Sequence, residues 1–153
     1  MSGGALPPLR RIVSARDITM GAAASRDWQP QHHDIAHAQG MKLPDIIMNA
    51  PTQTGWFHAY AMAWAGPGAR IARWRLKMRR PVCPGAAIAY SGSVLRQETG
   101  PPGALWIWLD LECRSADERL SAMALLLARP DAAGGDCAAI PADAWHPPAL
   151  DPA

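Results

Sequence analysis

The stretch that decides the fold is residues 45–66, DIIMNAPTQTGWFHAYAMAWAG. Small or apolar residues recur there at the spacing of one helix face, namely Gly55, Trp56, Ala59, Met62 and Ala63. Asn49 is a suitable N-cap, Pro51 is tolerated in a first helical turn, and Gly66-Pro67-Gly68 ends the pattern. The segment is therefore predicted to be one long, half-buried helix that lies close against a sheet.

Downstream of this helix the apolar period changes from helical to two. From Ile71 onward, one strand face is cationic and carries Arg73, Arg75, Lys77 and Arg79. Residues 81–85, PVCPG, interrupt the pattern because proline cannot donate to a sheet ladder. Alternation resumes over residues 86–95 and 105–112. Composition alone leaves residues 119–129 open between helix and strand, and we interpret them as the return strand of a hairpin. This order predicts an α+β fold in which an antiparallel sheet wraps around one central helix.

The two ends of the chain are expected to lie outside this unit. At 153 residues the chain has room for one domain, which we predict to span residues 10–129. Residues 1–9 are expected to form a flexible arm, and residues 130–153 a Pro/Ala-rich tail with at most Trp145 as an anchor. Trp106 and Trp108 share one strand face and are expected to lie under a partner subunit.

Composition excludes several classes of protein. Charged residues are 18% of the chain and the formal net charge is +2, which argues against a nucleic-acid-coating or disordered chain. Three widely spaced cysteines suggest neither a disulfide framework nor a zinc ribbon. No apolar run approaches the roughly 20 residues of a membrane helix. A cytoplasmic protein that binds neither membrane nor nucleic acid is expected.

The chemistry is concentrated upstream, in residues 25–34, SRDWQPQHHD. Asp27 and His32 are five residues apart, so they cannot share a helix face, but a loop bent at Pro30 lets them converge on one water molecule. Imidazole exchanges protons near neutral pH, and a carboxylate accepts a second hydrogen bond from the same water. Such a pair suits the addition of water to a polarised double bond, with backbone N–H groups at the start of the long helix holding the oxyanion.

At this point the sequence resembles a known family. The pattern Ser25-x-Asp27-x-x-Pro30-x-His32-x-Asp34, a helix with glycine near its first turn, and Pro-Val-x-Pro-Gly between two strands are similar to the MaoC-like (R)-specific enoyl-CoA hydratases of the hot-dog fold. Further residues resemble the small catalytic subunit of heteromeric steroid side-chain enoyl-CoA hydratases: Arg26–Gln29, His32–Asp34, Ala38–Gly40, Asp45-Ile46, Asn49, Thr52, Thr54-Gly55 and Trp64–Pro67. The chain differs from the usual family residue at Arg26, where glycine is common, and at Asn49, where histidine is common.

The resemblance implies a function and a set of site residues. The implied reaction is hydration of a 2-enoyl-CoA to a 3-hydroxyacyl-CoA without metal or redox cofactor. Asp27 and His32 would be the catalytic pair, and the Ala50 backbone N–H would meet the thioester oxygen. Substrate contacts are predicted for Asn49, Arg73, Arg75 and Lys77. The cationic strand face itself, which also includes Arg79, could receive the phosphates of coenzyme A. A bulky, steroid-like acyl group and a second hot-dog subunit, or a homodimer, are also implied.

Several alternatives stay open from the residues alone. The cationic strand face is also consistent with a merely solvated surface. His33, Asp34 and His37 could bind a metal, but no third histidine or HExxH pattern supports this. A non-catalytic hot-dog subunit that binds acyl-CoA, and a hot-dog thioesterase that releases free thiol, are the rival functions.

Overall fold

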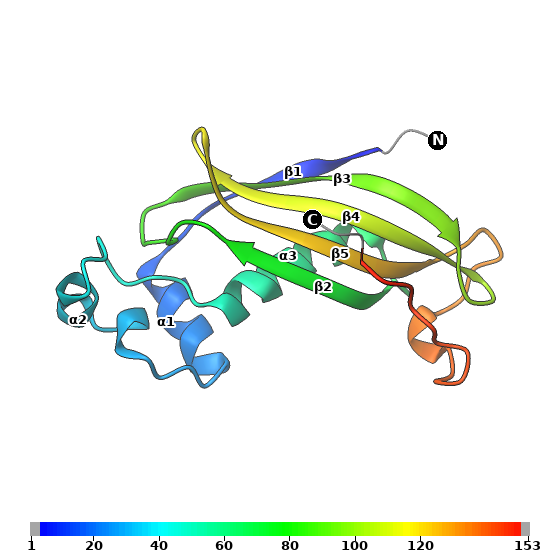
Figure 1. Ribbon diagram of the computed structural model, residues 1–153, viewed down its shortest axis with the longest axis horizontal. Coiled ribbons are helices and arrows are strands. Elements are labelled where there is room, and N and C mark those ends of the chain that lie inside the picture. Colours follow the sequence, from blue (N-terminus) through cyan, green and yellow to red (C-terminus); the bar gives the residue numbers. More distant parts are fainter. Residues whose placement is uncertain (1–3, 151–153) are drawn as a thin grey trace.

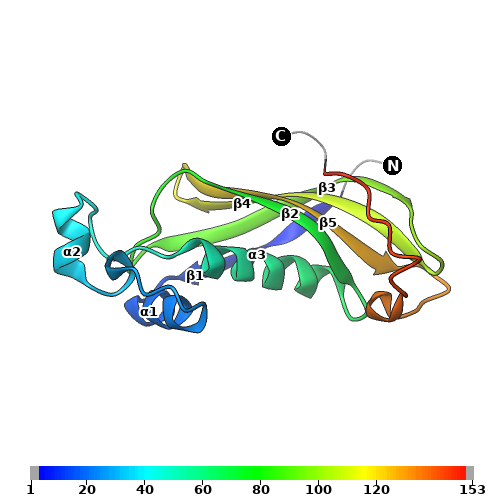
Figure 2. The same ribbon diagram turned by 60° about the horizontal axis from the view of Figure 1, so that its bottom comes forward.

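The computed structural model of the protein describes residues 4–150, so parts of the predicted arm and tail, residues 1–3 and 151–153, lie outside it. Five antiparallel strands form one sheet in the order β1-β3-β4-β5-β2. The elements are β1 (Ala5–Ile12), α1 (Ala15–Ala24), the 3-10 turn η1 (Pro30–His32), α2 (Ile35–Gly40), α3 (Ala50–Ala65), β2 (Arg70–Met78), β3 (Ala87–Thr99), β4 (Ala104–Ser115), β5 (Glu118–Pro130) and the 3-10 turn η2 (Cys137–Ala139). The sheet curves over α3 (Figures 1 and 2). The predicted α+β, hot-dog arrangement is confirmed.

The central helix has the predicted caps but a later start. The Asn49 side chain accepts a hydrogen bond from the Thr52 N–H, and Gly66 ends the helix with φ 84°. The prediction that the helix begins near Asp45 is wrong. Residues 46–48 are held in a non-helical path because the Ile47 N–H donates to Gln31 O and the Met48 N–H donates to Val82 O. Helix α3 therefore begins at Ala50, beside the loop that carries Asp27 and His32.

The predicted strands are confirmed, and the sheet order adds what the sequence did not show. Strands β3, β4 and β5 form consecutive hairpins, so the segment interpreted as a return strand is β5. Strand β2 pairs with β5 rather than with β3, which follows it in the chain. The segment Pro81–Gly85 thus carries the chain away from one edge of the sheet toward the other.

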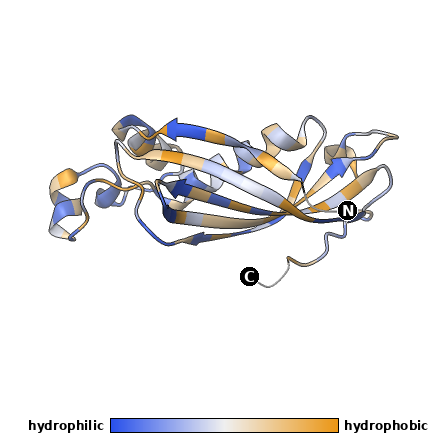
Figure 3. Ribbon diagram, turned by 90° about the horizontal axis from the view of Figure 1, so that it is seen from above, coloured by the Kyte–Doolittle hydropathy of each residue, from blue (hydrophilic) through white to orange (hydrophobic). Residues whose placement is uncertain are grey.

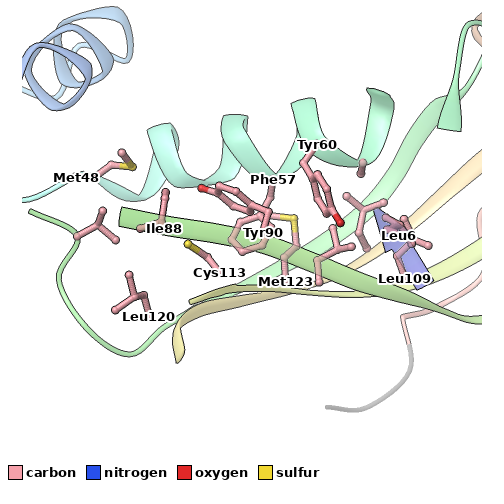
Figure 4. Packing of buried hydrophobic residues seen from close by; sticks show 14 of the residues in the cluster. Leu6, Met48, Phe57, Tyr60, Ile88, Tyr90, Leu109, Cys113, Leu120 and Met123 are labelled. Carbon is pink, nitrogen blue, oxygen red and sulfur yellow. The ribbon is translucent and has the colours of Figure 1, made fainter. Parts of the chain in front are cut away.

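The core lies between α3 and the inner face of the sheet (Figure 4). The Phe57 ring meets the Tyr90 ring edge to face at 4.9 Å between centroids. Tyr60, also on α3, donates its hydroxyl hydrogen to Pro7 O of β1 at 3.0 Å. Burying large apolar side chains of this kind contributes about 1.5–3 kcal/mol each. These contacts fix α3, and with it Ala50, relative to the sheet.

The N-terminal region is more ordered than predicted. Strand β1 begins at Ala5 and pairs with β3, so Ala5–Leu9 are not part of an arm. The helix of residues 15–24 is capped by Ser14. Asp17 is the third residue of that helix and returns a hydrogen bond to the Ser14 N–H, which completes a capping box.

The C-terminal segment covers the outer face of the sheet. Trp106 and Trp108 are 6% and 1% exposed, so the expectation that a partner subunit covers them is wrong. The Trp145 ring lies 4.9 Å from the Trp106 ring, and Trp108 Nε1 donates to Ala149 O at 3.1 Å. The Cys137 N–H donates to Gly68 O, which adds a second anchor. The tail is a packed part of the domain, because it removes the two indole side chains on the outer face of β4 from water.

The strands are mixed in hydropathy. Hydrophilic and hydrophobic residues both occur along the strands seen from above in Figure 3. Among the helices of residues 4–150, none has the length and apolar character required to cross a bilayer.

Candidate active site

The end of α1 places Asp27. Arg26 has φ 55°, and its N–H donates to Ala23 O while the Asp27 N–H donates to Ala22 O. This pair of bonds is a Schellman motif, which closes a helix with one residue in the left-handed region. Glycine usually takes that position because a side chain there costs about 1 kcal/mol. The carboxylate is therefore attached to a helix end and not to a free loop.

The 3-10 turn η1 places His32 opposite that carboxylate. Pro30 opens the turn, and His32 is 5% exposed. His32 Nδ1 lies 2.7 Å from Ile47 O. Because a carbonyl oxygen only accepts, Nδ1 carries a proton, which leaves Nε2 as the ring atom that can gain or lose one. Nε2 lies 3.3 Å from Asp27 Oδ2. The sequence prediction that Asp27 and His32 converge is thus met by the geometry.

Asn49 connects the carboxylate to the start of α3. Its Nδ2 donates to Asp27 Oδ2 at 3.0 Å and to Ser25 Oγ at 2.9 Å. Its Oδ1 accepts from the N–H and the hydroxyl of Thr52. An amide side chain has two donors and two acceptor positions, so all four are used within the chain. Asn49, 3% exposed, is a positioning residue for Asp27 in this structure, and its predicted substrate contact stays a prediction.

The same bond sets the charge state of Asp27. The hydrogen bond from Asn49 is the largest influence and holds the pKa of the Asp27 carboxyl below its usual value, opposed by desolvation. A bond from the Gln29 N–H and the proximity of His32 act in the same direction as Asn49. Asp27 is ionised at neutral pH and accepts hydrogen bonds.

Helix α1 approaches α3 closely enough to support this arrangement. A Cβ added at Gly21 would collide with the Oγ1 and Cγ2 of Thr52. Thr52 in turn holds Asn49. Gly21 therefore packs against Thr52, the residue that supports the cap of α3.

A cavity of about 490 Å³ opens onto Asp27 and His32, the candidate catalytic pair. Asp27 and His32 line it together with Ala50, Gln53, Met78 and Arg79, among others. Among the first three residues of α3, Pro51 has no N–H and the Thr52 N–H is bound by Asn49. The Ala50 N–H is therefore the one in this group for which the described residues supply no acceptor. Its place on the cavity is consistent with the predicted oxyanion contact, which stays a prediction.

The predicted phosphate contacts are not brought to this cavity. Arg73 donates to the carbonyl oxygens of Pro147 and Pro148 in the C-terminal segment. Arg75 and Lys77 line a different cavity, on the outer face beside Trp108. Successive side chains of a strand point to opposite faces, and the odd-numbered residues on this part of β2 face away from α3. Arg79, just past the end of β2, is the member of the cationic series that lines the catalytic cavity.

The weak metal hypothesis gains no support. Asp34 caps α2 by accepting from the His37 N–H, and His33 Nε2 lies 3.4 Å from Trp28 O. Among residues 4–150 no group of three histidine, cysteine or acidic side chains is placed to hold a metal ion.

Sequence reasoning missed two features of the site. Gln53 lines the cavity but occupies an ordinary helix position, and its polarity on a buried face was the available signal. The Asn49–Asp27 bond joins residues 22 positions apart, which no local pattern reveals.

Comparisons with known proteins agree with this geometry. The family described as "MaoC like domain" matches residues 6–100. The 3-oxo-4,17-pregnadiene-20-carboxyl-CoA hydratase beta subunit of Mycobacterium tuberculosis is 37% identical over 98 residues, which is 64% of this chain and 76% of that protein.

Two solved structures superpose well. A chain of the ChsH1-ChsH2 complex of Mycobacterium tuberculosis gives a TM-score of 0.78 at 28% identity and covers 84% of this chain and 98% of that chain. The (R)-hydratase of A. caviae involved in PHA biosynthesis gives a TM-score of 0.75 at 18% identity, over 85% and 97% of the two chains, and this likeness shows the fold alone.

Proposed function

The chain belongs to the MaoC-like domain family, and we propose that it adds water across the 2,3 double bond of a 2-enoyl-CoA to give a 3-hydroxyacyl-CoA. The observation that carries the proposal is the 3.3 Å separation of His32 Nε2 and Asp27 Oδ2. With a proton on Nδ1, Nε2 is the ring atom that can take up or release a proton beside the carboxylate. A water molecule held beside the two atoms can donate to the carboxylate or to unprotonated Nε2, so the pair is suited to position one water.

The reaction follows from that arrangement. The water oxygen attacks C3 while the Asp27–His32 pair takes one of its protons, and the pair delivers a proton to C2, so that H and OH are both added. Negative charge develops on the thioester oxygen, where the Ala50 N–H at the positive end of α3 donates to it. These steps need no metal or redox cofactor. General acid–base groups of this kind contribute about 10²- to 10⁴-fold to a rate.

The substrate class and the partner are part of the same proposal. The 37% identity with a steroid side-chain hydratase subunit supports a bulky acyl group on the thioester. The likeness to a chain of a two-component complex supports a second hot-dog subunit, with a homodimer as the alternative. The proposed location is the cytoplasm, where free thiols such as Cys83, Cys113 and Cys137 stay reduced.

The test is loss of enoyl-CoA absorbance with a short-chain and a steroid-side-chain substrate. Wild type is compared with Asp27→Asn and His32→Ala, and with His33→Ala as the matched control because His33 is exposed. Each protein is assayed alone and with any co-purifying subunit. We expect the first two variants to lose at least about 100-fold in turnover and the control to keep it.

Other outcomes would replace the proposal. Retained acyl-CoA binding without turnover in wild type would make the chain a non-catalytic subunit. Release of free thiol in place of hydration would make it a thioesterase.

A further inference from the structure

Gln53 is a buried polar side chain on the wall of the catalytic cavity. It is 3% exposed and lies one helical turn after Ala50, on the same side of α3. Its Oε1 is buried and has no hydrogen-bond partner among the residues that the structure describes. Leaving such an acceptor unsatisfied is unfavourable, and an apolar residue of the same size would suit a packed helix face better. The position therefore points to a donor that arrives with a ligand.

The hydrogen bond made by the Gln53 amide nitrogen determines which atom of the side chain is left without a partner. Gln53 Nε2 donates to Met78 Sδ at 3.4 Å. A thioether sulfur accepts weakly and has no hydrogen to donate, so rotating the amide by half a turn would set two acceptors against each other. The orientation with Nε2 toward Met78, which leaves Oε1 without a partner, is the one that makes a bond. The ligand group opposite Gln53 must consequently be a donor.

The proposed substrate has few hydrogen-bond donors near its reacting end, which limits the groups that could bind Gln53 Oε1. The enoyl group and the thioester have none. The nearest donor is the first amide N–H of the thiol arm, two methylene groups from sulfur. Ala50 and Gln53 are three residues apart on α3, so their Cβ atoms are separated by about 5–6 Å. This spacing suits a substrate whose thioester oxygen lies at Ala50 and whose amide lies at Gln53.

We propose that Gln53 Oε1 accepts a hydrogen bond from the amide N–H nearest the thioester sulfur and makes the enzyme selective for amide-bearing thiol arms. The proposal rests on the function proposed above and assigns a substrate contact to a residue outside the Asp27–His32 pair.

The test uses two thioester probes that differ at that one group. Crotonyl N-acetylcysteamine keeps the amide, and the crotonyl thioester of 2-acetoxyethanethiol has an ester oxygen in place of the N–H. We expect wild type to favour the amide probe in kcat/KM by about threefold to tenfold, the range of one neutral hydrogen bond. Gln53→Met should bring that ratio to about one by slowing the amide probe alone. Thr54→Val, at the next helix position and away from the cavity lining, should keep the wild-type ratio.

Binding of the saturated butanoyl versions of both probes separates this proposal from the proposed function. Calorimetry on the full chain, with any co-purifying subunit, measures their dissociation constants without any hydration step. An amide preference that Gln53→Met abolishes supports the contact even if no enoyl thioester is hydrated. Equal binding of the two saturated probes by wild type, or an equal loss on both probes in Gln53→Met, would overturn it.

Discussion

Asn49 Nδ2 lies 3.0 Å from Asp27 Oδ2, so the residue that caps the central helix also holds the candidate catalytic carboxylate. One buried amide thereby joins two elements that are far apart in the sequence. Its two halves have separate tasks, because Oδ1 caps α3 and Nδ2 binds Asp27. Substitutions can remove one task and keep the other.

Asn49→Ser is expected to raise the pKa of the Asp27 carboxyl toward its ordinary value. Serine remains a good N-cap but has no N–H to give, so the largest influence that lowers this pKa is lost. Asn49→Ala should raise the pKa in the same way and also lose about 1 kcal/mol of stability with the cap. Carbon-detected NMR titration of Asp27 measures the first effect and thermal unfolding the second.

The pH dependence of stability provides a further check on this pair. Because the folded-state pKa of Asp27 is depressed, its ionised form stabilises the fold above the unfolded-state pKa, and this contribution is lost as pH falls through the folded-state pKa. Wild type should therefore lose more stability on acidification than Asn49→Ser. Parallel stability profiles for the two proteins would contradict the assignment.

Arg26→Gly is expected to stabilise the protein by about 1 kcal/mol. Arg26 has φ 55°, a conformation that glycine adopts without the steric cost of a Cβ. Arg16→Gly is the matched control, because Arg16 is an exposed residue within α1 and glycine there should destabilise by about 1 kcal/mol. Chemical denaturation of both variants measures the difference. A destabilised Arg26→Gly would mean that the arginine side chain makes a compensating contact.

Gly21→Ala is expected to destabilise by about 1–3 kcal/mol, the usual cost of overpacking. The added methyl group meets the Thr52 side chain, which supports Asn49, so activity should fall along with stability. Gly55→Ala is the control, since a Cβ at that exposed helical position meets nothing within 4 Å and should stabilise by up to about 1 kcal/mol. Thermal unfolding distinguishes the two variants. A Gly21→Ala variant as stable as wild type would refute the close approach of α1 and α3.

Trp145→Ala is expected to cost about 2 kcal/mol, less than for a fully buried tryptophan because Trp145 is only half-buried. Its ring packs on Trp106, and the Arg70 guanidinium lies 3.9 Å from its centroid. Trp28→Ala, at a position 68% exposed, should change stability by less than about 0.5 kcal/mol. Urea unfolding of the two variants tests whether the C-terminal segment is an integral part of the domain. Indistinguishable midpoints would show that it is not.

Local signals in the sequence were enough to predict the central helix, the strands downstream of it and the pairing of Asp27 with His32. Caps, glycines and a period of two are local signals, and they located Asn49, Gly66 and the strand of Arg73–Lys77 without tertiary information. The Asp27–His32 pairing was also predictable, because five residues bent at a proline bring the two side chains together over a short stretch.

Tertiary structure decided where these elements lie relative to one another. The placement of β2 beside β5 leaves Arg73, Arg75 and Lys77 on the outer face, away from the cavity that Asp27 and His32 line, and their phosphate contacts stay a prediction. The burial of Trp106 and Trp108 depends on a C-terminal segment whose composition predicted a loose tail. Both outcomes arise from contacts between residues distant in sequence, whose free energy depends on the surface each element buries and not on its local pattern.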